Sequence, residues 1–395
     1  MRDSVSWVGR LLSVMLVVLT GCGREGGATG TVGDSPKPAP VVRRALDWPM
    51  FRGNPALTGV TEASLPSALS LKWSFKAGGQ ILSSAAIVED KVYVGSTEGT
   101  MLALNMKDGS KLWQFKAGGP VESSPLILEG KVFFGDSNTN FYALDATTGS
   151  LVWHRGADAE IKAGANWMKS PDGKGTWVLA GSWDNKLYCW DAATGRSNWV
   201  YETGNRINGA PAAGEGVTVF GGCDALIHVV QLVDGKKVKE IEAGAYIAAT
   251  AALTGGRAFV GHYENEFLSV DLAKGEVVWR YRDRAFPFMS SPAVTADRVL
   301  VGSRDKRLHC LDRATGQAVW TFATRGKVES SPVVAGDKVV VGSDDGRVYL
   351  VALGDGRELW NYEIGQPVQA SPAVVDGHVV IGADDGVVYC FAEKK

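Results

Sequence analysis

The sequence has few of the residues from which metal centres and disulfide frameworks are built. Its 395 residues include five cysteines and five histidines, and neither type shows a spacing typical of such sites. The 41 basic and 43 acidic residues give a net charge of −2, which offers no electrostatic basis for binding nucleic acid. No apolar run is long enough to span a bilayer as a helix, and extended helical periodicity is missing after the N-terminus.

What the sequence does contain is a repeated unit of 40 residues that runs from Leu71 to the C-terminus. Its clearest marker is a tryptophan, which we interpret as an anchor that packs one repeat against the next. These structural anchors are Trp73, Trp113, Trp153, Trp199, Trp279, Trp320 and Trp360. The successive gaps are 40, 40, 46, 80, 41 and 40 residues, and Lys239 occupies the skipped position. A period of this length predicts a β-propeller.

Each unit is predicted to contain four short strands, named A to D from the axis outward. Strand A contains Ser-Ser-Pro, B ends in Val-Gly-Ser, C carries Tyr-x-Leu-Asp, and D carries the tryptophan. The last unit ends at its C strand, whereas the segment 71–77 is a D strand with no A, B or C before it. We therefore predict an all-β fold, an eight-bladed propeller of four-stranded antiparallel blades, in which the D strand at 71–77 completes the last blade.

The N-terminus resembles a bacterial lipoprotein signal. Basic residues flank an apolar run at 11–19, and a Leu-Thr-Gly-Cys sequence ending at Cys22 resembles a lipobox, whose cysteine is acylated with palmitate or a similar chain. We predict a signal peptide over 1–21 and a lipidated N-terminus with a flexible tether over 22–47. Ordinary secretion with an incidental cysteine is the alternative. In Gram-negative lipoproteins an aspartate directly after the acylated cysteine favours retention in the inner membrane. Because Gly23 stands at that position, the resemblance implies an outer-membrane anchor that faces the periplasm.

The propeller is expected to occupy residues 48–395, with the blades at 71–395. The preceding segment, 48–70, contains the large aromatics Trp48 and Phe51 in a polar stretch. Because such side chains need burial, we expect this segment to dock against the propeller.

Several recurring residues have a structural interpretation. Asp-Gly pairs such as Asp345-Gly346 predict hairpin turns rather than calcium loops, because they lack the required density of ligands. Cys189, Cys310 and Cys390 share one repeat position on strand C, which calls for a small buried residue. A disulfide between Cys189 and Cys223 is left open.

Charged residues also reach the predicted axis-facing strands, at Glu122, Lys162 and Glu329. We interpret them as the lining of a solvated channel rather than as a catalytic set.

The full unit, Ser-Ser-Pro … Val-Gly-Ser-x-Asp-Gly-x-x-Tyr-x-Leu-Asp-x-x-Thr-Gly-x-x-x-Trp, resembles the pyrroloquinoline-quinone (PQQ) repeat. The best copies lie at 330–346 and 144–153, and the resemblance covers 71–395. It implies either a quinoprotein dehydrogenase, which binds PQQ and calcium, or a member of the BamB family of non-enzymatic lipoproteins in outer-membrane β-barrel assembly. Chain length, lipobox and repeat number resemble BamB. The dehydrogenases carry adjacent cysteines and long inserted loops, which this sequence lacks.

Departures from the repeat concentrate in units three to six, in the D–A and B–C loops of one predicted face. They are Trp183, Arg206, Ile207, Tyr246, Tyr263, Arg284, Phe286, Phe288 and Arg304. Aromatic residues with arginine are typical of protein-binding hot spots, so we predict a partner-binding patch. The alternative is that some of these side chains fold inward and fill the channel. Only Arg206 matches the segment with which BamB-like proteins contact their partner.

Together these features predict a non-enzymatic protein with no catalytic residue, metal or cofactor. We expect a monomer that enters a complex by binding the periplasmic domain of an outer-membrane barrel-assembly protein. Alternatives from other classes are a propeller dependent on PQQ and calcium, another small-molecule binder, and a carbohydrate binder that stacks sugars on Trp183 and Tyr263.

The predicted patch leads to a test. The double substitution Phe286→Ala and Phe288→Ala is expected to weaken partner binding in a pull-down assay and to leave folding intact.

Overall fold

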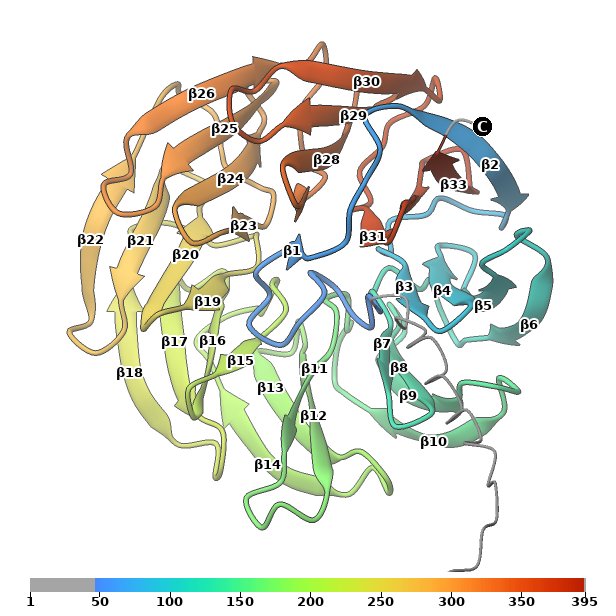
Figure 1. Cartoon of the computed structure of the whole chain (residues 1–395). Coiled ribbons are helices and arrows are strands. Elements are labelled where there is room, and N and C mark those ends of the chain that lie inside the picture. The colour runs from blue at the N-terminus through green and yellow to red at the C-terminus, as the bar shows by residue number, and fades with distance from the viewer. Residues whose placement is uncertain (1–46, 394–395) are drawn as a thin grey trace, which may run out of the picture. The chain divides into compact units, whose positions relative to one another are not determined.

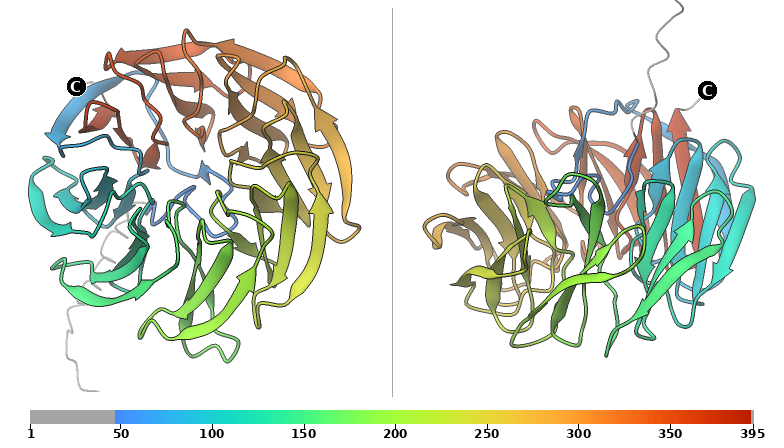
Figure 2. Two further views of the ribbon diagram at one scale, coloured as in Figure 1. Left: turned by 180° about the vertical axis from the view of Figure 1, so that it is seen from behind. Right: turned by 90° about the horizontal axis from the view of Figure 1, so that it is seen from below.

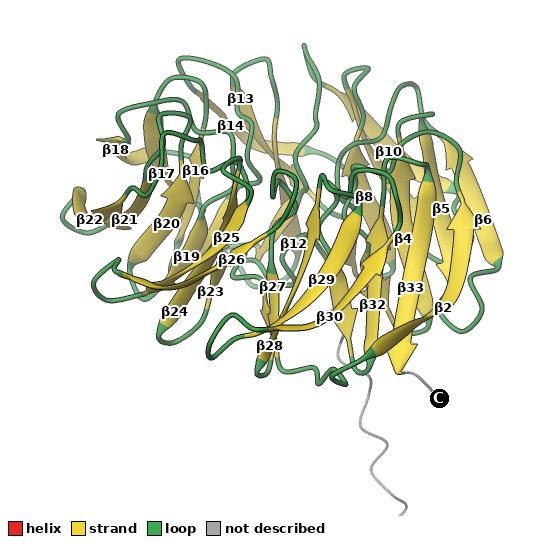
Figure 3. Cartoon of the chain, turned by 90° about the horizontal axis from the view of Figure 1, so that it is seen from above, coloured by secondary structure: helices red, strands yellow, loops and turns green. Residues whose placement is uncertain are grey.

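The computed structural model describes residues 47–393, which form a ring of eight β-sheets around a central channel (Figure 1). The described residues contain 33 strands and no helix (Figure 3), so none of their segments is a helix that could cross a membrane. The prediction of an eight-bladed, all-β propeller is confirmed. The predicted signal peptide over 1–21, the lipidation site Cys22 and the tether up to residue 46 lie outside the described residues.

In every blade, strands A to D follow one another antiparallel from the channel outward. Blade 1 contains β3 (Ala86–Val88), β4 (Lys91–Ser96), β5 (Thr100–Asn105) and β6 (Lys111–Lys116). Blade 2 contains β7 (Leu126–Leu128), β8 (Lys131–Gly135), β9 (Asn140–Asp145) and β10 (Leu151–Gly156). Blade 3 contains β11 (Asn166–Lys169), β12 (Thr176–Gly181), β13 (Lys186–Asp191) and β14 (Ser197–Glu202). Blade 4 contains β15 (Ala212–Gly214), β16 (Val217–Gly221), β17 (Leu226–Gln231) and β18 (Lys237–Glu242).

The second half of the ring repeats this order. Blade 5 contains β19 (Ala252–Thr254), β20 (Arg257–Gly261), β21 (Phe267–Asp271) and β22 (Glu276–Tyr281). Blade 6 contains β23 (Ala293–Val294), β24 (Arg298–Ser303), β25 (Arg307–Asp312) and β26 (Ala318–Ala323). Blade 7 contains β27 (Val333–Ala335), β28 (Lys338–Ser343), β29 (Arg347–Ala352) and β30 (Glu358–Glu363). Blade 8 contains β31 (Ala373–Val375), β32 (His378–Gly382), β33 (Val387–Glu393) and β2 (Leu69–Lys76).

The eighth blade is closed by the two ends of the repeat region. β2 pairs antiparallel with β33, from Leu69 opposite Glu393 to Lys76 opposite Val387. The closing strand thus begins two residues earlier than the predicted segment 71–77. Because this pairing joins the first strand of the ring to the last, it leaves no open edge between the end blades.

The tryptophans on the D strands contact the neighbouring blade. Six of the seven donate Nε1–H to a backbone carbonyl in the C–D turn of the next blade, at 2.9–3.2 Å. The ring of Trp113 also lies over Gly149 in that turn, where an added Cβ would be 2.7 Å from the indole. Trp360 is the exception, because blade 8 has no C–D turn: its C strand β33 and its D strand β2 come from opposite ends of the repeat region. It packs instead against Phe391 and Tyr362.

The cysteines on the C strands are buried thiols. Cys189, Cys310 and Cys390 are free, and so is Cys223, which means that the disulfide left open between Cys189 and Cys223 does not form in this structure. Burial raises the pKa of Cys310 and Cys390 to about 12. Both thiols therefore stay protonated and unreactive at neutral pH.

The segment that precedes β2 runs inside the ring, where it contacts every blade (Figure 2). Backbone hydrogen bonds join it to the A strands of blades 1, 2, 4, 5, 6 and 7 and to the A–B turn of blade 8, and in blade 3 the side chain of Asn166 donates to Pro55 O. Within it, β1 (Val60–Thr61) pairs parallel with β27, so the sheet of blade 7 has five strands rather than four. Segment 48–64 is therefore an inner ring that links blades far apart in the sequence.

Arg52 is the central residue of this inner ring. Its side chain is fully buried and donates to the carbonyl oxygens of Pro292, Ser331 and Pro332 in blades 6 and 7, at 2.6–3.1 Å. Burial lowers the pKa of this guanidinium to about 9, which still leaves it charged at neutral pH. The guanidinium lies over Gly59, where any Cβ would collide with it. One buried cation thus satisfies three carbonyl groups that no strand pairs.

Replacing Arg52 is expected to destabilise the protein strongly. Arg52→Met fills part of the space but leaves three buried carbonyls without a donor, so the free energy of unfolding should fall by about 2–4 kcal/mol. Urea unfolding followed by tryptophan fluorescence measures the change. The control Arg325→Met alters an exposed arginine and should shift stability by less than about 0.5 kcal/mol. Equal stability of the two variants would contradict a structural role for Arg52.

Candidate functional site

One end of the ring, here called the mouth, is built from the D–A loops and B–C turns of all eight blades. In each blade, one N–H of the B–C turn donates to a carbonyl of the D–A loop that leads into the same blade, at 2.9–3.2 Å. The donors, here called the rim positions, are Thr97, Ser137, Trp183, Cys223, Tyr263, Arg304, Asp344 and Asp384. This repeated bond fixes each pair of loops together, so the mouth presents a preformed surface.

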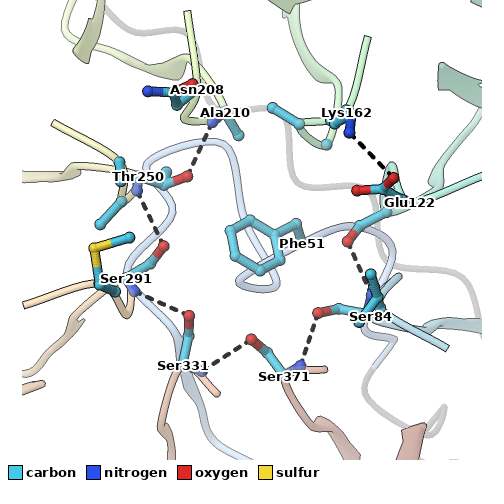
Figure 4. A pocket seen from close by; sticks show the side chains of 17 residues that line it. Phe51, Ser84, Glu122, Lys162, Asn208, Ala210, Thr250, Ser291, Ser331 and Ser371 are labelled. Carbon is cyan, nitrogen blue, oxygen red and sulfur yellow. Dashed lines mark hydrogen bonds and ion pairs between the residues drawn. The ribbon is translucent and has the colours of Figure 1, made fainter. Parts of the chain in front are cut away.

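Inside the mouth is a cavity of about 210 Å³ with Phe51 of the inner ring in its centre (Figure 4). Its wall comes from residues at one position of successive D–A loops, among them Leu82, Glu122, Lys162 and Asn208. The inner ring thus partly fills the channel behind the mouth.

A belt of hydroxyl groups surrounds Phe51. Six backbone N–H groups donate to the side-chain oxygen at the same position of the next blade, at 2.9–3.1 Å. The acceptors are Ser124 and five residues labelled in Figure 4, namely Thr250, Ser291, Ser331, Ser371 and Ser84. The belt is interrupted at Gly164 and Ala210, which have no hydroxyl. A Cβ at Gly164 would lie 3.1 Å from that of Phe51, so the missing side chain at Gly164 makes room for Phe51. The second serine of Ser-Ser-Pro therefore joins neighbouring blades.

Charged groups in the wall are paired with one another. Lys162 Nζ lies 3.2 Å from Glu122 Oε1, and both side chains are about three-quarters buried. The same ammonium is 4.5 Å from the ring centre of Trp183, and the guanidinium of Arg206 is 4.9 Å from that ring. The indole ring of Trp183 is thus in cation–π contact with two side chains, Lys162 and Arg206, and these contacts restrain its orientation.

On another part of the rim, Arg304 donates to Glu329 at 2.6 Å. Burial works against the charge of Arg304, but this hydrogen bond and the carboxylate charge raise its pKa overall. Nearby, burial and the charge of Glu329 raise the pKa of Asp344. The predicted axis residues Glu122, Lys162 and Glu329 therefore all belong to ion pairs.

The nine predicted patch residues divide into three groups by exposure. Arg206, Tyr246, Tyr263, Arg284 and Phe286 are exposed, whereas Trp183 and Arg304 are half-buried. The other two, Ile207 and Phe288, are buried at 1% and 2% exposure. The prediction that these two belong to an accessible patch is wrong.

The burial of Ile207 and Phe288 follows from their position in the repeat. Every D–A loop has an apolar residue there that covers the glycine ending the B strand of the preceding blade. An added Cβ on Gly181 would lie 2.5 Å from Ile207, and one on Gly261 would lie 2.5 Å from Phe288. Aligning the loops by their distance from Ser-Ser-Pro would have shown this, because Val121 occupies the same position in a plain repeat.

The loop that carries Phe286 and Phe288 is one residue longer than the next D–A loop. Ser290 lies eleven positions after Trp279, whereas Ser330 lies ten positions after Trp320. The additional length allows Phe286, which is 45% exposed, to stand out from the surface while Phe288 fills the conserved core position of the repeat.

Sequence reasoning missed the role of the inner ring. Trp48 and Phe51 were expected to dock against the propeller, but their path through the channel and the part played by Arg52 were not anticipated. The sequence offered two signals: an arginine that directly follows the aromatic Phe51, and the glycines Gly53 and Gly59, which both adopt positive φ.

The two phenylalanines should respond differently to truncation. Phe288→Ala opens a cavity between blades 5 and 6 and should lower the free energy of unfolding by about 3–5 kcal/mol. Phe286→Ala removes an exposed ring and should change it by less than about 0.5 kcal/mol. Denaturant unfolding of the single variants measures both. Comparable losses would show that the assignment of one ring to the core and the other to the surface is wrong, and the double variant first considered would confuse the two effects.

Comparisons with known proteins agree with this architecture. The family model described as outer membrane protein assembly factor BamB matches residues 68–170, 162–282 and 269–392. No curated protein sequence gives a match.

Solved structures that share the fold include BamB from Moraxella catarrhalis (22% identity, TM-score 0.70, covering 82% of this chain and 98% of that one). The computationally designed protein Ika8 is also similar (18% identity, TM-score 0.72, covering 82% and 99%). A third is quinohemoprotein alcohol dehydrogenase from Comamonas testosteroni (15% identity, TM-score 0.74, covering 89% and 81%). At these identities the likenesses concern the fold alone. The family match, which extends over nearly the whole ring, shows that this chain belongs to the PQQ-repeat family described as outer membrane protein assembly factor BamB.

Proposed function

We propose that this protein is a non-enzymatic scaffold that binds another protein through its mouth. The observation that carries the proposal is the group of exposed departures from the repeat on blades 4 to 6. In this group Tyr246, Tyr263 and Phe286 are 58%, 49% and 45% exposed. Large aromatic side chains at a surface favour protein association, because their burial removes much apolar area from water at little entropic cost.

The three aromatic residues are held by neighbouring loops. The backbone of Tyr263 donates to Tyr246 O at 2.9 Å, and Arg304 N donates to Pro287 O next to Phe286. The bonds between D–A and B–C loops recur around the whole mouth, so docking would freeze little backbone motion. Rigid loops that carry aromatic side chains suit a binding surface better than they suit a moving lid.

The charges around these aromatics suggest what the partner presents. Arg284, Lys306, Arg325 and Lys327 are exposed in the loops of blades 6 and 7, and none forms an ion pair within residues 47–393. An acidic surface on the partner would complement them and would speed association.

Membership of the BamB family supports a more specific proposal. The partner would be the periplasmic domain of an outer-membrane barrel-assembly protein, and the protein would be an outer-membrane lipoprotein anchored through Cys22. The position of Asp47, the first described residue, is compatible with an anchor at the end of the ring opposite the mouth. Asp47 Oδ1 accepts from Glu89 N in the A–B turn of blade 1, at the end of the ring opposite the mouth. An anchor attached before residue 47 would then leave the mouth accessible.

A quinone-binding function is the second candidate, because quinohemoprotein alcohol dehydrogenase shares the fold. The residues of the channel do not fit this cofactor. The cavity holds about 210 Å³, below the ~300–1,000 Å³ of ordinary ligand sites, and Phe51 lies in its centre. Its lining offers a single cation, Lys162, which is already paired with Glu122, whereas PQQ carries three carboxylates. We therefore favour the scaffold.

Changing the exposed aromatics should weaken binding without unfolding the protein. A triple variant, Tyr246→Ser, Tyr263→Ser and Phe286→Ser, is expected to bind the periplasmic domain of the barrel-assembly protein at least about thirtyfold more weakly, equivalent to about 2 kcal/mol. Biolayer interferometry with the purified domain measures the affinity, and thermal unfolding checks the fold.

The control for this experiment is Val238→Ser, on the outer strand of blade 4. Val238 is 53% exposed but lies away from the mouth. It should leave the affinity unchanged. If the triple variant binds as tightly as this control, the proposed surface is wrong, and if the unaltered protein does not bind the domain, the proposed partner is wrong.

A further inference from the structure

Two carboxylates and an imidazole converge at the junction of blades 5 and 6, outside the channel cavity. They belong to Asp283 in the loop after β22, Asp305 in the turn between β24 and β25, and His309 on β25. One potential ligand atom from each lies within 4.8 Å of the others. We propose that these three residues bind one divalent metal ion, and that the ion is zinc.

The first argument is an unpaired oxygen. The side chain of Asp305 is 2% exposed, and its Oδ1 lies 3.2 Å from Nε2 of His309. Its Oδ2 is also buried and has no hydrogen-bond partner among the described residues. Leaving a buried carboxylate oxygen unpaired is costly, so such a group needs an explanation. A cation held between Asp305 and the neighbouring ligands supplies one.

The second argument comes from the corresponding junction two blades earlier in the ring, between blades 3 and 4. There Asp224 and His228 form the same pair at 2.9 Å, and the hydroxyl of Tyr201 contacts Nδ1 of the imidazole at 3.1 Å, as Tyr281 contacts His309. Both oxygens of Asp224 are satisfied, because Oδ1 accepts from Leu226 N and Oδ2 accepts from Gly204 N. The pair itself is therefore structural, whereas the unpaired oxygen distinguishes Asp305 from Asp224.

The third argument is the position of Asp283. It lies four residues after the tryptophan position, where none of the other seven repeats has an ionisable residue. Those residues are Ala77, Ala117, Ala157, Thr203, Ala243, Thr324 and Ile364. A third ligand is thus present at the junction where the buried Asp305 has an oxygen without a partner.

The surroundings leave Asp283 available for a metal. Its side chain is 34% exposed, and its nearest cation, Arg307, lies 4.0 Å away, at the limit of an ion pair. Arg280 and Arg282 are held by Glu266 at 2.8 Å each. A metal can therefore reach Asp283 from solvent, and only the weak contact with Arg307 competes with it.

The ligand types favour zinc over calcium or magnesium. Zinc accepts imidazole nitrogen together with carboxylate oxygen, whereas the other two ions prefer sites made of oxygen alone. The hydroxyl of Tyr281 can donate to Nδ1 of His309 or accept from it. It can therefore support the tautomer in which Nε2 is free to bind metal, as a partner behind the ligand does in other zinc sites. Water would complete the coordination.

The chain offers a matched pair of variants for the test. Calorimetric titration of the purified, untagged and chelator-treated protein with zinc chloride is expected to show one ion bound per chain, with calcium binding at least about tenfold more weakly. Asp305→Asn should reduce zinc affinity about 10–100-fold or more, and Asp224→Asn, the same change at the junction lacking a third carboxylate, should leave it unaltered. Asp283→Thr installs the residue found in two other repeats, so it should weaken zinc binding while the melting temperature without metal stays the same.

Three results would overturn the proposal: no zinc-dependent heat with the unaltered protein, equal affinities of Asp305→Asn and Asp224→Asn, or unchanged zinc binding by Asp283→Thr. Cobalt provides an independent readout, because its visible absorption reports coordination directly and should be lost in Asp283→Thr. These measurements require no protein partner, so their outcome does not depend on the proposed scaffold function.

Discussion

The pairing of β2 with β33 is the interaction on which the rest of the ring depends. A propeller blade contacts only its two neighbours, so an unclosed ring would expose a sheet edge and the faces of two blades to water. Closure places Trp73 against the carbonyl of Met106 in blade 1, the same contact that other tryptophans make around the ring. Two segments more than 300 residues apart in sequence therefore form one blade.

A second constraint comes from within. The segment 48–64 contacts all eight blades, and Arg52 links blades 6 and 7 through three carbonyls. The ring is thus held at its outer edge by the tryptophans and at its inner edge by this segment. The same segment places Phe51 in the channel, which limits the space for a ligand there.

Residues that depart from the repeat differ in whether they serve the fold or add a new feature to the surface. Asp283 departs from the repeat because it is a carboxylate, and it lies beside a buried oxygen without a partner. Phe286 departs because the loop is one residue longer, and its ring is exposed. Phe288 differs in size from its counterparts but fills the same core position as Val121. Only the first two kinds of departure add something that the scaffold itself does not require.

The sequence by itself determined the number of blades, the order of strands and the closure of the ring. It could do so because each repeat buries the same positions, so the pattern within one unit already contains the contacts between units. Tertiary structure showed why Ile207 and Phe288 are buried at their shared repeat position, because each covers a glycine in the preceding blade. It also decided the path of segment 48–64 and the meeting of Asp283, Asp305 and His309. These contacts join residues that no repeat relates, and their positions follow from packing between blades rather than from local periodicity.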